Sequence, residues 1–114
     1  MQQDISLDGR RFRPVGDTIG GEVSPDTVFA FSQEGDLIHA RYVGGRIRLG
    51  YLVGTHAGTT IHFRYAQVNT AGETATGQSH DRIEILPDGR LRLHERWSWD
   101  SQEGSGMSIL EEIG

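Results

Sequence analysis

The connections between the patterned segments of this chain are too short to allow anything other than antiparallel strands. Sixteen glycines divide the sequence, and many stand in turn-like connectors such as Glu34-Gly35, Gly44-Gly45 and Pro87-Asp88-Gly89. Glycine supplies the positive φ angles that tight hairpin turns require. A parallel crossover needs about a dozen or more residues. Segments that follow one another in sequence are therefore predicted to pair as neighbours in one sheet.

The segments between these turns have the two-residue period of β-strands. They are Arg10–Val15, Val28–Gln33, Asp36–Val43, Arg46–Val53, Thr59–Asn69, Glu73–Leu86, Arg90–Trp99 and Gly106–Glu112. No comparable stretch has a helical period. The sequence predicts an all-β, single antiparallel up-and-down meander of roughly eight strands.

Such a meander has two exposed edges unless its first and last strands pair, and closure into a barrel removes both. We expect residues 1–114 to form a single β-barrel domain, with residues 1–9 as a flexible N-terminus. At eight strands a barrel interior is either filled by side chains or holds one small ligand.

Alternation along each strand separates an inner row of side chains from an outer row. For the segment 46–53 the predicted inner row is Ile47, Leu49, Tyr51 and Val53. For the two segments on either side of it, the inner rows are Ile38, Ala40 and Tyr42, and Ile61, Phe63, Tyr65 and Gln67. The segment 73–86 has the poorest period, with a bulge expected near Gly77 and with Gln78 and His80 on the inner row.

The segment Arg90–Trp99, RLRLHERWSW, places Glu95 on the same row as Leu91, Leu93, Trp97 and Trp99. An inward-facing charge is costly unless it is paired or used. One interpretation is that Glu95 accepts hydrogen bonds from tyrosine and glutamine side chains, or pairs with an arginine, and closes a polar network that caps the core. The other is that a few convergent polar groups orient a ligand in an aromatic cavity. The sequence leaves both interpretations open.

The predicted function is small-molecule binding in an aromatic, partly polar internal cavity. The expected ligand-binding residues are Tyr42, Tyr65, Gln67, Gln78, His80, Trp97 and Trp99. As an alternative, Glu95 acts as a catalytic acid or base in a small cofactor-independent enzyme such as an isomerase, cyclase or dehydratase, its pKa raised by the apolar row. A third possibility is a cavity-free structural or interaction barrel.

Composition narrows the choice of partners. The net charge of −5 disfavours nucleic acid and anionic membranes, and no segment has the roughly 18 apolar residues of a membrane span. The chain has no cysteine, and its five histidines lack metal-ligand spacing, so we expect no metal and no cofactor. A cytoplasmic location is expected, and a homodimer is possible.

A family resemblance covers most of the chain, from about Phe12 to Glu112. The runs GGRIRLGYLVG, FRYAQVN, GETATGQSH, EILPDGRLRLHERWSW and SGMSILEE resemble small bacterial proteins that often carry the name N-acetylglutamate synthase. That name implies acetyl transfer from acetyl-CoA, for which acetyltransferases use a Gln/Arg-x-x-Gly-x-Gly/Ala loop that opens a helix. The run Arg41–Arg46 lacks the last position and leads into a strand, so the residues do not favour acetyltransferase activity. In architecture the chain is similar to the calycin class of lipocalin- and avidin-like barrels, which implies a calycin-like barrel with an internal ligand site.

Overall fold

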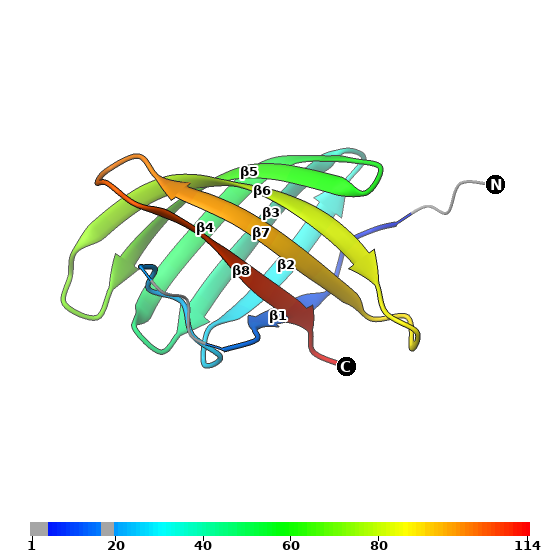
Figure 1. Cartoon of the computed structure of the whole chain (residues 1–114), viewed down its shortest axis with the longest axis horizontal. Helices are drawn as coiled ribbons and strands as arrows, with labels where there is room; N and C mark the ends of the chain where they lie inside the picture. The colour runs from blue at the N-terminus through cyan, green and yellow to red at the C-terminus, as the bar shows by residue number, and fades with distance from the viewer. Residues whose placement is uncertain (1–4, 17–19) are drawn as a thin grey trace.

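The computed structural model describes residues 5–16 and 20–114, and these residues form a closed barrel of eight antiparallel strands in sequence order (Figure 1). The strands are β1 (Arg11–Pro14), β2 (Val28–Glu34), β3 (Leu37–Gly44), β4 (Ile47–Ala57), β5 (Thr60–Asn69), β6 (Thr74–Ile85), β7 (Leu91–Trp99) and β8 (Ser105–Glu112). β1 pairs with both β2 and β8, which closes the sheet. The predicted all-β meander and its closure are confirmed. Within the described ranges no helix is long and apolar enough to cross a membrane.

The turn between β3 and β4 shows why glycine is needed there. Gly44 and Gly45 have φ angles of 124° and 61°, which side chains other than glycine rarely adopt. A Cβ atom on Gly44 would also lie 2.0 Å from the backbone oxygen of Asp26. Both the predicted turn and the close approach of the preceding loop therefore depend on this glycine pair.

The predicted inner row of β4 is wrong beyond Ile47. Tyr51 and Val53 are 55% and 56% exposed, whereas Leu52 is 2% exposed. The pairing of β4 with β5 shifts register between Ile47 and Leu49, and a one-residue shift moves every following side chain to the other face. Gly50 is thereby turned inward, where a Cβ atom would lie 2.2 Å from the ring of Tyr42. The bulge thus places a glycine, which has no side chain, next to the Tyr42 ring.

One end of the barrel, where β1 begins and β8 ends, is filled by apolar side chains; we call it the closed end. Leu7 lies before β1, is fully buried and belongs to the core. Its N–H donates to Gln33 Oε1 at 2.9 Å. Leu7 is thus packed into the core within the span expected as a flexible N-terminus, and the first four residues of that span lie outside the described part.

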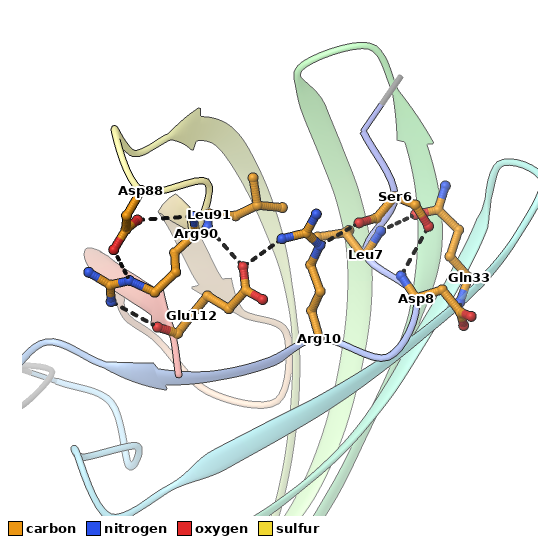
Figure 2. A network of polar contacts seen from close by, with 9 residues as sticks. All are labelled: Ser6, Leu7, Asp8, Arg10, Gln33, Asp88, Arg90, Leu91 and Glu112. Carbon is orange, nitrogen blue, oxygen red and sulfur yellow. Dashed lines mark hydrogen bonds and ion pairs between the residues drawn. The ribbon is translucent and has the colours of Figure 1, made fainter. Parts of the chain in front are cut away.

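Polar contacts surround the closed end (Figure 2). Glu112 Oε1 accepts from Arg10 Nη1 at 2.7 Å and from the Leu91 N–H at 2.9 Å. Arg90 donates to the Glu112 carbonyl oxygen at 3.1 Å and, through Nε, to Asp88 Oδ2 at 2.7 Å. These contacts join the start of β1, the turn before β7 and the end of β8.

Candidate functional site

The opposite end of the barrel encloses a small cavity; we call it the cavity end. The cavity has a volume of about 40 Å³, and in this measure one water needs about 10–15 Å³. It therefore has room for about three waters or a chemical group of similar size. Its lining residues are Gly21, Glu22, Val23, Phe29, Tyr42, Leu52, Phe63, Tyr65, Gln67, Ser79, Glu95, Trp97, Trp99 and Ser108.

Most residues expected from the sequence to share one site do lie together. They are Tyr42 on β3, Tyr65 and Gln67 on β5, and Glu95, Trp97 and Trp99 on β7. Alternation on β5 and β7 is regular enough to identify the inner row. On β3 alternation alone is ambiguous, and the absence of charged side chains picks out the inner row. The structure brings these six side chains to one cavity.

Gln78 and His80 do not belong to this cavity, and the predicted inner row of β6 is wrong. His80 is exposed and stacks on His62 of β5 outside the barrel, with ring centroids 4.0 Å apart. Gln78 Oε1 lies 3.2 Å from His62 Nε2 on the same face. The buried row of β6 is the alternate one: Ala75, Gly77, Ser79, Asp81 and Ile83. This row has few large apolar side chains, so its inward position gave little hydrophobic signal.

The corrected row of β6 adds Asp81, which faces Glu95 across the β6–β7 pair. The two residues are only 3% and 7% exposed. Ser79 Oγ donates to Asp81 Oδ1 at 2.5 Å, and Ser108 Oγ donates to Glu95 Oε1 at 2.9 Å. When both carboxyl groups are ionised, Asp81 Oδ2 is buried without a hydrogen-bond partner among the described residues. The carboxylate that the sequence placed inside the barrel is thus one of a buried pair.

Burial and mutual repulsion make full ionisation of this pair unfavourable. Burial is the main cause that raises the pKa of Asp81, and the neighbouring Glu95 charge adds to it. Burial also raises the pKa of Glu95, partly offset by hydrogen bonds with Asp81 and Ser108. Two close carboxyl groups of this kind hold one proton between them over a range of pH. Within that range the pair carries a single negative charge beside the cavity.

A half-buried loop residue, Glu22, completes the polar wall at the mouth of the cavity. Its two carboxylate oxygens accept hydrogen bonds from Gln67 Nε2 at 2.8 Å and Asn69 Nδ2 at 2.7 Å. Gln67 Oε1 in turn accepts from the Tyr42 hydroxyl at 2.9 Å. Burial raises the pKa of Tyr42 and of Tyr65, so both hydroxyls remain neutral donors. Glu22 stands outside any periodic segment, and alternation could not have identified it.

Aromatic rings form most of the remaining wall. Phe29 stacks on Tyr42 with centroids 4.5 Å apart, and Trp99 makes edge contacts with Tyr65 at 5.7 Å and with Trp97 at 5.8 Å. Trp97 packs closely on β8, since a Cβ atom on Gly106 would lie 2.6 Å from its ring. Trp99 Nε1 donates to the Gly20 carbonyl oxygen at 3.2 Å, which ties the mouth loop to β7.

The described residues contain no group of three or more side chains that could hold a metal ion. The cavity lining itself offers the carboxyl groups of Glu22 and Glu95, neutral hydroxyl and amide groups, and aromatic rings.

Comparison with known proteins identifies one family. The sequence model of the avidin-like protein family matches residues 5–113, nearly the whole chain and every strand of the barrel. No curated protein matches the chain. The family match agrees with the calycin-like barrel expected from strand count and turn length, and it names no ligand for this chain.

Proposed function

Because the chain belongs to the avidin-like protein family, as the match over residues 5–113 shows, we propose that it binds a small molecule in the cavity at the cavity end. The observation that carries this proposal is the half-open aromatic cavity with a buried carboxyl pair beside it. Small-molecule sites are typically concave and mostly apolar, with a few polar groups that fix orientation. The lining of this cavity has that composition.

A purely structural role for Glu95 fits the contacts less well. A structural network is expected to satisfy its buried polar atoms, yet Trp97 Nε1 in the cavity wall has no partner among the described residues. A second carboxyl group opposite Glu95 also raises the cost of burial instead of lowering it. Protein scaffolds retain such arrangements where binding or chemistry uses them.

The test is native mass spectrometry of freshly purified protein, followed by chemical identification of any bound compound. Titration of that compound into ligand-free protein should change tryptophan fluorescence, because both tryptophans of the chain line the cavity. A compound that binds by calorimetry but leaves the intensity and wavelength of this fluorescence unchanged would place the binding site elsewhere.

The carboxyl pair favours acid–base catalysis as a second candidate function. A carboxyl group whose pKa is raised toward neutrality can both donate and accept a proton, and the pKa of both members is raised. In this proposal Glu95, which lines the cavity, exchanges a proton with the bound molecule. Asp81 positions the Glu95 carboxyl group and influences its pKa through a hydrogen bond. Incubation of the identified ligand with the protein in D₂O tests this: deuterium should enter a carbon-bound position of the ligand, and Glu95→Gln should abolish the exchange.

A further inference from the structure

Acidic side chains surround the cavity without a basic partner among the described residues. Glu22 and Glu95 line it, and Asp81 lies beside Glu95 on the neighbouring strand. The described lining residues include no arginine, lysine or histidine. A buried carboxylate without a cation beside it takes up a proton more readily, so a cation that enters the cavity would stabilise its ionised form.

The arginines of the described residues that form ion pairs do so on other surfaces. Arg10 pairs with Glu112 at 2.7 Å at the closed end, and Arg92 pairs with Glu111 at 2.7 Å on the outer face. Arg64 pairs with Asp100, both on the outside of the barrel. Among the described residues, no ion pair includes Asp81 or Glu95.

Within the pair, Glu95 is the member that keeps the charge next to the cavity. Asp81 is the more deeply buried of the two and does not line the cavity. A proton on Asp81 can be donated to Glu95, which adds to the hydrogen bond from Ser108 Oγ at 2.9 Å. The Glu95 carboxylate is then held by donors on the two neighbouring strands. Glu95 is only 7% exposed, yet it borders the free volume.

The size and walls of the cavity restrict the cation that can enter. A volume of about 40 Å³ accepts a group of about three or four non-hydrogen atoms, if each occupies about the space of one water. Aromatic faces within about 6 Å of a cation stabilise it, and tyrosine and tryptophan rings form the wall. A planar delocalised cation is less strongly hydrated than an ammonium ion and matches a carboxylate with two parallel N–H donors.

From these contacts we infer that the ligand enters the cavity with an amidinium or guanidinium group, which donates to Glu95 and lies against the tyrosine and tryptophan rings. This inference rests on the proposed small-molecule function and specifies its ligand class. A neutral amide or urea has the same shape but leaves the charge of the carboxyl pair uncompensated.

The test compares acetamidinium with acetamide, which have the same number of non-hydrogen atoms and differ in charge. The readout is the pair of indole N–H signals in ¹H–¹⁵N NMR spectra, because Trp97 and Trp99 are the two tryptophans of the chain and both line the site. Acetamidinium should shift these signals with an affinity at least about tenfold higher than that of acetamide, a difference of about 1.4 kcal/mol.

Glu95→Gln should remove this preference, while Glu84→Gln is the matched control. Glu84 lies on the same strand as Asp81 but outside the barrel, where it pairs with His94 at 2.7 Å, so its loss should leave the preference unchanged. Ser108→Ala provides a second variant if Glu95→Gln does not fold; it removes one donor to Glu95 and should alter acetamidinium affinity more than acetamide affinity.

Equal or tighter binding of acetamide overturns the cation inference while leaving the cavity as a binding site. A co-purified ligand without a cationic group, or indole signals that respond to such a ligand and not to acetamidinium, also overturns it and leaves the proposed function standing. If no co-purified compound and neither probe reaches the indoles, both proposals fail.

Discussion

The two ends of the barrel interior are built from the same strands but contain different kinds of side chain. At the closed end the inner side chains are fully or almost fully buried and apolar: Leu7, Phe12, Phe31, Ile38, Ile61, Ile83, Leu91, Leu93 and Leu110. At the cavity end the same strands supply tyrosine, tryptophan, glutamine and carboxyl groups around free volume. β7 alone passes from Leu91 and Leu93 to Glu95 and Trp97.

This contrast shows how a single small domain can separate stability from binding along one axis. Apolar burial is the main favourable term in folding, and the closed end adds a belt of hydrogen bonds around its rim. The cavity end contains free volume and buried carboxyl groups, both of which reduce stability. Substitutions at the closed end should therefore mainly change stability, whereas substitutions at the cavity end should also change ligand binding.

The largest loss of stability is expected at the closed end. Leu93 is fully buried, and Leu93→Ala should lower the free energy of unfolding by about 2–5 kcal/mol because it leaves a cavity in a packed core. Ligand affinity of the folded protein should stay unchanged. Urea denaturation and calorimetry measure the two quantities.

Val53→Ala is the matched control for this loss. Val53 is 56% exposed, so its truncation should cost less than about 0.5 kcal/mol. A loss as large as that of Leu93→Ala would mean that β4 has the register expected from simple alternation.

The next largest effect is expected at Gly50, where the backbone of β4 contacts the Tyr42 ring. In Gly50→Ala the new methyl group would overlap the Tyr42 ring, and the strain should cost about 1–3 kcal/mol and displace the hydroxyl from Gln67. Unlike Leu93→Ala, this variant should also weaken ligand binding. Adding Tyr42→Leu should recover part of the stability but not the affinity, as measured by denaturation and calorimetry. If the second change recovers nothing, the cost of Gly50→Ala arises in the backbone.

The sequence predicted the apolar inner rows better than the polar inner row of β6, and the reason is physical. Hydrophobic alternation identifies rows such as Leu91 and Leu93, whose burial needs no partner. On β6 the inward row of Ser79 and Asp81 is polar, and only its register against Glu95 reveals that it is buried. The bulge in β4 likewise shows itself only in the pairing of β4 with β5, which a local pattern does not contain.

Substitution in the carboxyl pair should change the free energy of unfolding in the opposite direction from substitution in the apolar core. Glu95→Gln removes a buried charge that faces Asp81, so the free energy of unfolding at neutral pH should stay the same or rise by about 0.5–2 kcal/mol. Binding of the native ligand should weaken at the same time. Denaturant midpoints and calorimetry decide the outcome: a clear drop in stability with unaltered affinity would make Glu95 a structural residue, like those of the closed end.

The pH dependence of stability should also arise at the cavity end. Both carboxyl groups have a pKa raised above the unfolded values of 3.8 and 4.5, so the folded state binds more protons than the unfolded chain above that range. The free energy of unfolding should then fall as pH rises from about 4.5 through the folded pKa values, by at most about 1.4 kcal/mol per pH unit for each proton. Denaturant melts across this range should show a steeper fall for the wild type than for Glu95→Gln.

Carboxylates with a lowered pKa provide the internal contrast. The hydrogen bond from His94 lowers the pKa of Glu84. The stability that such a group contributes is lost only as pH falls below the ordinary pKa of a carboxyl group. Glu84→Gln should therefore leave the slope above pH 4.5 as it is in the wild type. Equal slopes for wild type and Glu95→Gln would mean that the pair is fully ionised or hydrated.

The smallest effect is expected at the mouth, where Glu22 is half-buried and holds Gln67 and Asn69. Glu22→Gln keeps one acceptor oxygen, so it should lower the free energy of unfolding by less than about 1 kcal/mol. Its charge is partly solvated and screened by salt, whereas that of Glu95 is buried. Acetamidinium affinity should thus fall less in Glu22→Gln than in Glu95→Gln, and the Glu22 contribution should shrink as salt is added. If Glu22→Gln weakens acetamidinium more than Glu95→Gln does, the cation binds at the mouth, and the buried pair has a different use.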